Sequence, residues 1–224
     1  MNKIVLKMAG AFLALILVAA LGAYVLTFAK PFAPPPGLPK LGQVTDFTLT
    51  ERTGKDITNR DLLGKVWVAN FIFTACGGPC PTLSQHFAAL QKEIAGHTDV
   101  RLVSFSVNPT GDTPPVLTKY ATKYGADPQR WLFVTGEKVP VYTLIETSFK
   151  LVAQPNYDPK APPSEKFIHS TRLVLVDRTG AIRGYYDGLL PETYPKLKAD
   201  IDRLLKEPTP NAPSLTISCP QCYP

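Results

Sequence analysis

An apolar run that leads directly into two closely spaced cysteines constrains the fold of this 224-residue chain more than any other feature. The run covers residues 66–73, and Cys76-Gly77-Gly78-Pro79-Cys80 follows it after two residues. The pattern predicts a buried strand that delivers two thiols to a helix beginning near Pro79. Unpaired N–H groups and partial positive charge at a helix N-terminus both favour thiolates.

The spacing of these cysteines leaves two kinds of chemistry open. Three residues separate them, whereas the pairs typical of thiol–disulfide exchange are separated by two. The wider spacing permits exchange, and it also lets both sulfurs turn toward one soft metal ion. Thiolates prefer Cu(I), zinc or iron–sulfur centres. Two thiolates do not complete most such sites, so we expect a third ligand elsewhere in the chain.

The N-terminal segment predicts export. Residues 8–29 carry no charge, and about 20 apolar residues span a bilayer. Lys3 and Lys7 precede the segment, so the positive-inside rule predicts a single-pass anchor in the cytoplasmic membrane with the domain on the periplasmic or extracytoplasmic side. Small residues at 20–23 leave a cleaved signal peptide as the alternative.

The rest of the chain reads as one α/β domain with a proline-rich linker before it. We predict a cytoplasmic N-terminus (1–7), an anchor (8–29), a linker (30–40), a domain (41–206) and a flexible tail (207–224). Apolar patterns in the domain predict strands at 47–49, 66–73, 100–107 and 131–134, helices at 81–94, 114–124, 139–147 and 192–205, and a hairpin of 172–176 with 181–186. This alternation predicts a mixed sheet covered by helices on both faces.

The net charge of +6 does not indicate a nucleic-acid partner. Half of it comes from Lys3, Lys7 and Lys30, which flank the uncharged segment. The other basic residues are scattered, without a run and without interleaved aromatic residues.

Of the three histidines, His169 is the candidate third ligand. His86 lies six residues beyond Cys80 in the same predicted helix, roughly 9 Å along its axis, and is expected on the helix surface. His97 follows Gly96 at a predicted helix end and is expected to be solvated. His169 directly precedes the predicted strand 172–176. In thioredoxin-like folds this approach passes beside the dithiol, although the cis-proline usual there is absent here.

Five motifs in order make the chain resemble the SCO/SenC family over about residues 40–206. They are Phe47-Thr48-Leu49-Thr50 with Leu62-Leu63-Gly64-Lys65-Val66; 73–81 around the cysteines; Ser106-Val107-Asn108-Pro109 with 112–117; 131–136; and His169-Ser170 with 175–180. The resemblance implies a membrane-anchored, thioredoxin-like copper protein that assists assembly of the binuclear copper centre of cytochrome c oxidase. It implies Cys76, Cys80 and His169 as ligands of Cu(I) or Cu(II).

We therefore predict a copper-binding assembly factor rather than an enzyme with substrate turnover. Its expected partners are the copper-centre subunit of a cytochrome oxidase and an upstream copper donor. The alternative is a thiol–disulfide reductase that uses Cys76 and Cys80 to keep the copper-ligand cysteines of the oxidase reduced. The chain departs from the family where Gly77-Gly78-Pro79 replaces the frequent Pro-Asp-Val and where Asn108 replaces a frequent aspartate.

Two further features are weighed beside this interpretation. The tail pair Cys219 and Cys222 has the spacing of a second metal site, of a redox partner for the first pair, or of an inert disulfide. Thr74-Ala75-Cys76 suggests a peroxiredoxin-type peroxidase, but Asn70 stands where such sites usually have a proline.

Overall fold

The computed structural model describes residues 3–28 and 37–208, and the chain divides into two compact units at residue 36. The first unit contains helix α1 (Lys3–Phe28), whose side chains are described only at Met8 and over 10–24. Within the described residues, no helix combines the length and hydropathy needed to cross a membrane. The predicted spanning helix at 8–29 thus has no support here. Most of the predicted linker and tail, with Cys219 and Cys222, lies outside the described residues.

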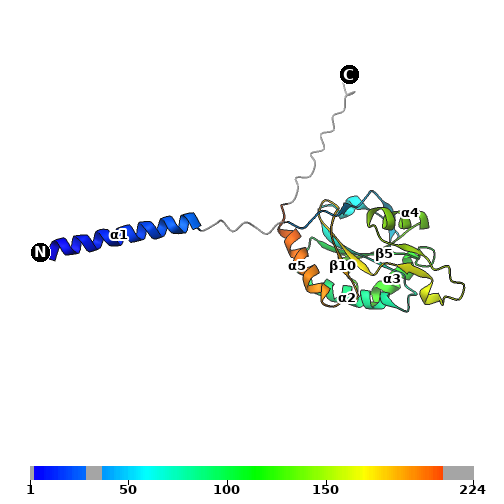
Figure 1. The fold of residues 1–224 in the computed structure, drawn as a ribbon. Helices are drawn as coiled ribbons and strands as arrows, with labels where there is room; N and C mark the ends of the chain where they lie inside the picture. Colours follow the sequence, from blue (N-terminus) through cyan, green and yellow to red (C-terminus); the bar gives the residue numbers. More distant parts are fainter. Residues whose placement is uncertain (1–2, 29–36, 209–224) are drawn as a thin grey trace, which may run out of the picture. The chain divides into compact units, whose positions relative to one another are not determined.

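The second unit is built on an eight-stranded mixed sheet (Figure 1). Its strands are β1 (Gly42–Gln43), β2 (Thr48–Glu51), β3 (Asp56–Thr58), β4 (Val66–Ile72), β5 (Val100–Ser106), β6 (Trp131–Thr135), β9 (Arg172–Val176) and β10 (Ala181–Asp187). They lie in the order β1-β10-β9-β4-β5-β6-β2-β3. The central strands β4, β5 and β6 are parallel, and the other pairs are antiparallel. The predicted mixed sheet is confirmed.

Helices cover both faces of the sheet, as the sequence predicted (Figure 1). On one face lie α2 (Pro79–Glu93), α3 (Pro114–Lys123) and α5 (Thr193–Lys206), and on the other lie α4 (Lys138–Thr143) and the π-helical turn η2 (Leu144–Ser148). Phe87 of α2 packs against Trp131 with ring centroids 5.7 Å apart, and Phe149 packs against Phe71 at 5.2 Å. Because it is covered on both sides, every residue of β4 is buried, which explains its continuous apolar sequence.

The structure differs from the prediction between residues 138 and 148. One helix was predicted over 139–147, but α4 ends at Thr143 and the chain continues as η2. The wider turn places Ser148 where its hydroxyl lies 2.6 Å from that of Thr45 and accepts the Thr45 N–H at 3.1 Å. A tertiary contact thus accompanies the change in helix type.

A second, two-stranded sheet was not predicted. It pairs β7 (Ala153–Pro155) with β8 (Phe167–His169) in antiparallel register, with Ala153 opposite His169. Between them lies the 3-10 turn η3 (Pro163–Glu165), and a similar turn, η1 (Asn59–Leu62), precedes β4. Strands of three residues, one of which ends in proline, are too short to produce an alternating pattern in the sequence.

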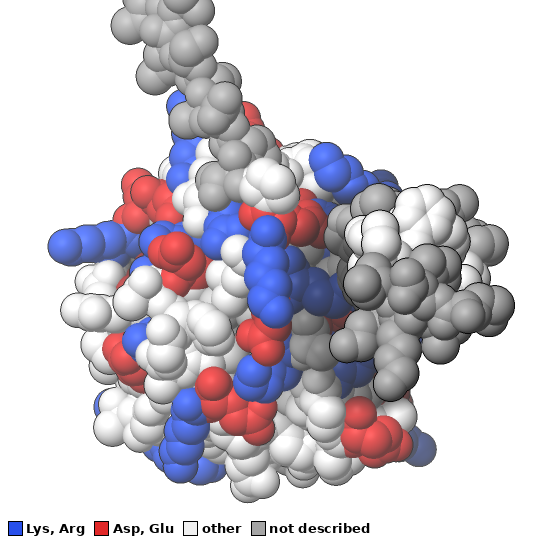
Figure 2. All heavy atoms as spheres, turned by 90° about the vertical axis from the view of Figure 1, so that its left-hand side faces the viewer, with Lys and Arg blue, Asp and Glu red and all other residues white. Residues whose placement is uncertain are grey.

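The charge on the domain surface is mixed. On the face drawn in Figure 2, Lys and Arg side chains of the described residues lie interspersed with Asp and Glu. Neighbouring charges of opposite sign largely cancel one another's long-range field. This face therefore does not present an extended patch of one sign.

Candidate metal centre

Cys76 and Cys80 lie on either side of the junction between β4 and α2. Cys76 is on the connecting loop, 9% exposed, and its N–H donates to the carbonyl of Phe73 at 3.2 Å. Cys80 is the second residue of α2 and is fully buried. Pro79 is the first residue of α2, a position where the missing N–H of proline costs nothing. The strand–turn–helix arrangement predicted for the motif is confirmed.

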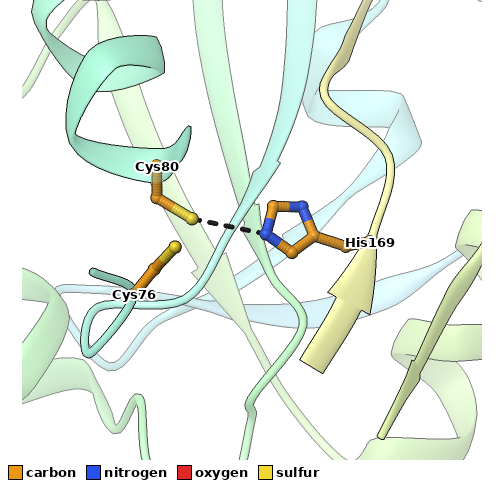
Figure 3. Close-up of side chains that lie close together, drawn as sticks. All are labelled: Cys76, Cys80 and His169. Atoms are coloured by element: carbon orange, nitrogen blue, oxygen red, sulfur yellow. Dashed lines mark hydrogen bonds between the residues drawn. The ribbon is translucent and has the colours of Figure 1, made fainter. Parts of the chain in front are cut away.

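His169 reaches these thiols from the last residue of β8. Its Nε2 lies 3.3 Å from Cys80 Sγ, and one ligand atom from each of the three residues falls within 4.8 Å of the others (Figure 3). Cys80 and His169 are 89 positions apart in the chain. The β7–β8 hairpin, absent from the predicted elements, is what brings the imidazole to the cysteines.

A second hydrogen bond orients the His169 ring. Nδ1 lies 3.1 Å from the carbonyl oxygen of Ser170. A carbonyl only accepts, so Nδ1 carries the proton and Nε2 keeps its lone pair toward the sulfurs. Metal-binding histidines characteristically use their second nitrogen in this way. The ring is further held by Phe73, whose edge-to-face contact has a centroid separation of 5.8 Å.

The two thiols have opposite pKa shifts. The hydrogen bond from Cys80 lowers the pKa of Cys76 to about 4, against the opposing effect of burial, with further contributions from the N–H groups of Cys80 and Gly78. The same hydrogen bond and burial raise the pKa of Cys80. At neutral pH the reduced pair therefore holds one thiolate, Cys76, and one thiol, Cys80, whose single S–H lies between the Cys76 thiolate and His169 Nε2, 3.3 Å away.

Alkylation tests this assignment. With Cys219 and Cys222 replaced by serine, we expect iodoacetamide to modify reduced Cys76 at a nearly constant rate from about pH 8 to about pH 5, with a fall as the pH approaches about 4. The Cys76 thiol has its ordinary pKa of 9.0 in the unfolded chain, so between about pH 4 and 9 the unfolded chain binds more protons than the folded protein. The contribution of Cys76 to the free energy of unfolding therefore rises with pH from about 4 to 9.

Cys80→Ala removes the hydrogen bond, so the midpoint of the Cys76 alkylation profile should move upward, whereas Cys80→Ser keeps a donor and should retain most of the shift. A parent midpoint near the ordinary thiol value would contradict the assignment.

Asp112 holds the start of the cysteine loop through Thr74, a role that was not predicted from the sequence. It is 1% exposed and accepts hydrogen bonds from the Thr74 hydroxyl and N–H and from the Ser106 hydroxyl, the two hydroxyl contacts both at 2.6 Å. Burial raises its pKa, although these hydrogen bonds oppose that effect. The only signal in the sequence was its place in the motif with Ser106, which carried no distance information.

Gly77 is needed for a steric reason. A Cβ on Gly77 would lie 2.9 Å from Cβ of Ser164 in η3, closer than side chains normally approach. The segment that leads into β8 therefore packs directly on the cysteine loop.

The structure separates the remaining sequence candidates from the donor group. His86 is on α2 as predicted, but its Nδ1 bonds the carbonyl of Gly188 at 3.0 Å, so it is not a free surface residue. His97 is partly exposed and lies 3.5 Å from a carboxylate oxygen of Asp202. The described residues contain no cis peptide bond, consistent with the missing proline before β9.

Fold and site together define a thioredoxin-like domain with a two-thiol, one-imidazole donor group. Sulfur and imidazole nitrogen are ligands that copper accepts, with Cu(I) favoured by the thiolates. The family model SCO1/SenC matches residues 38–206. The chain belongs to the SCO1/SenC family.

Individual relatives agree with this assignment. The SCO1 protein homolog of Bacillus subtilis is 33% identical over 161 residues, covering 71% of this chain and 81% of the relative. The solved structure of BsSco, described as a member of the Sco family of cytochrome c oxidase assembly proteins with a disulfide switch, is 30% identical with a TM-score of 0.68, covering 77% of this chain and all of the other. Copper-bound ScoI of Bradyrhizobium japonicum is 26% identical with a TM-score of 0.56, covering 72% and 99%.

Proposed function

We propose that this protein is a copper-binding assembly factor for a respiratory cytochrome c oxidase. It holds one copper ion through Cys76, Cys80 and His169 and passes it to the binuclear copper site of the oxidase. The observation that carries the proposal is the convergence of these three donor atoms within 4.8 Å in a domain of the SCO1/SenC family. The copper in the related ScoI structure supports the choice of metal.

The state of each donor suits the uptake of a soft cation. Cys76 is already a thiolate and His169 Nε2 already has a free lone pair, so only the Cys80 thiol must release a proton. Cys76 is 9% exposed whereas Cys80 is fully buried, so Cys76 is the sulfur that an incoming ligand would reach first. Copper can therefore leave by stepwise exchange of ligands with a cysteine of the client, without a change in the fold.

An anaerobic Cu(I) titration tests the proposal. In the full chain with Cys219→Ser and Cys222→Ser, we expect one tightly bound copper, and we expect Cys76→Ser with Cys80→Ser to abolish it. The serine background ensures that the stoichiometry reports on this site alone. A parent protein that binds no copper tightly would sink the assembly-factor proposal.

A thiol–disulfide reductase is the second candidate, favoured by the low pKa of Cys76. The Cys76 thiolate would attack a client disulfide, breaking its S–S bond and forming a mixed disulfide. Cys80 would then attack Cys76, closing the Cys76–Cys80 disulfide and releasing the client, which has gained two electrons. One proton of the client dithiol comes from the Cys80 thiol and the other from solvent. An external thiol reductant would restore the pair. This activity needs no His169, so an unaffected reduction rate in His169→Ala distinguishes the two functions.

The cellular setting forms part of the proposal. We propose an anchor at 8–29 in the cytoplasmic membrane, a domain at 41–206 on the extracytoplasmic side, the copper-centre subunit of the oxidase as client and a separate upstream copper donor. Support comes from the uncharged sequence of 8–29 and the lysines before it. Deletion of residues 1–29 should release the domain from the membrane fraction. If the shortened protein stayed in the membrane fraction, the proposed anchor at 8–29 would be contradicted.

A further inference from the structure

One residue, Gly188, connects the elements that carry two of the donors. Gly188 follows β10 and is buried. Its N–H donates to the carbonyl of Thr171 at 3.2 Å, two residues after His169. Its own carbonyl accepts from His86 Nδ1 at 3.0 Å and from the Tyr194 hydroxyl at 3.0 Å. Helix α2 is thus joined through the backbone of one residue to the segment that follows His169, and Tyr194 of α5 donates to the same Gly188 carbonyl.

No side chain fits at this junction. A Cβ on Gly188 would fall 2.7 Å from the Thr171 carbonyl oxygen and 2.9 Å from a methyl of Leu173, and it would be closest of all to a methyl of Leu83. Leu83 is fully buried and lies one turn beyond Cys80 on α2. The glycine is therefore required by the close approach of α2 to the start of β9. Any larger residue would push the two apart.

His86 fixes the other side of the junction. Because a carbonyl only accepts, its Nδ1 carries the proton in the bond to Gly188. The ring also packs edge-to-face on Tyr194 with centroids 4.9 Å apart. His86 and Cys80 belong to the same continuous helix, so the bond that holds His86 also limits the movement of Cys80 relative to the β8–β9 segment.

We propose that Gly188 and His86 are positioning residues for the donor group. They hold α2 against the segment after β8 so that Cys80 Sγ and His169 Nε2 remain 3.3 Å apart. Neither residue belongs to the group of three donors. The inference rests on the proposed function only where copper binding is the measured quantity, because the separation of the two side chains is a property of the copper-free protein as well.

Gly188→Ala tests the proposal in the full chain with Cys219→Ser and Cys222→Ser. We expect Cu(I) affinity to fall about 10-fold, as for other residues that orient metal ligands. Gly96→Ala is the matched control, because a Cβ there meets open space. In a His169→Ala background, Gly188→Ala should change affinity by less than about 2-fold, because it acts through His169. An equal loss in both backgrounds would overturn the proposal.

Substitutions at His86 keep the test valid should Gly188→Ala fail to fold. His86→Leu removes the bond to Gly188 and should weaken copper binding, whereas the amide N–H of His86→Asn can donate to the same carbonyl and should restore most of it. Equal copper affinities of His86→Leu and His86→Asn would contradict a role for the hydrogen bond between His86 and Gly188.

A measurement without metal separates this inference from the proposed function. In the copper-free protein, the NMR resonances of the His169 ring should shift in Gly188→Ala and His86→Leu and stay unchanged in Gly96→Ala. Unshifted resonances in the first two variants would overturn the positioning role. A parent that binds no copper would refute the proposed function, and the His169 resonances would still decide the role of Gly188.

Discussion

Replacing His169 by alanine is expected to weaken copper binding by about 100-fold or more. The estimate follows because the loss of groups that merely orient metal ligands costs about 10- to 100-fold, and in the proposed site His169 supplies a ligand atom itself. Nε2 has its lone pair directed at the sulfurs, and no second histidine lies with them in the described group. The measurement is a competition titration of the reduced protein with a Cu(I) chelator of known affinity.

His97→Ala is the control for that experiment. It removes the same side chain at a partly exposed position whose ring lies beside Asp202, away from the donor group, and should leave affinity unchanged. The His169→Ala protein should also keep the thiolate of Cys76, because Cys80 supplies the main hydrogen bond. Unchanged copper affinity in His169→Ala would remove His169 from the ligand set and favour the reductase.

Replacing Arg183 by methionine is expected to lower the free energy of unfolding by about 3–5 kcal/mol, the range found when one partner of a buried ion pair is removed. Arg183 is 5% exposed, and its Nη1 lies 2.7 Å from Asp177 and 2.8 Å from Glu207. Its Nε also donates to the carbonyls of Leu38 and Pro39. Methionine removes the cation beside two carboxylates and the donor to these carbonyls, although Asp177 keeps the hydrogen bonds that its Oδ1 accepts from Thr179 and Ala181. Urea unfolding followed by tryptophan fluorescence measures the change.

Lys198→Met provides the comparison for Arg183. The ion pair of Lys198 with Asp202 has a similar length, 2.8 Å, but both side chains are about one third exposed, and surface pairs contribute roughly 0–1 kcal/mol. Neither substitution contacts the donor group, so copper affinity of the folded proteins should be unchanged. Losses of similar size in the two variants would show that burial of the Arg183 network does not govern its contribution.

Local sequence was sufficient for the elements whose pattern is long and continuous. The apolar run 66–73 predicted β4, and the prolines at 79 and 114 marked the starts of α2 and α3 to within two residues. The hairpin of β9 and β10 was also predicted within one residue at each end. Such elements are specified by the periodic exposure of their own residues, a property that can be read without knowing their neighbours.

Elements whose conformation depends on contacts with distant parts of the chain were not predicted from the sequence. The π-helical turn η2 accompanies a bond between Ser148 and Thr45, and β7 and β8 are too short to form a recognisable pattern. Asp112 and Gly188 act through partners that are distant in sequence, Thr74 and Leu83 among them. Packing of this kind depends on which surfaces the fold brings together.

The sequence by itself determined the two thiols, their place between a strand and a helix, and the family to which the motifs pointed. It also singled out His169, although only through the expected course of the chain before β9. The tertiary structure decided the distance from His169 to Cys80, the proton on Nδ1, the opposite pKa shifts of the two thiols and the glycine at 188. These depend on atoms from α2, β8 and the loop after β10, and only folding places those atoms within a few ångströms of one another.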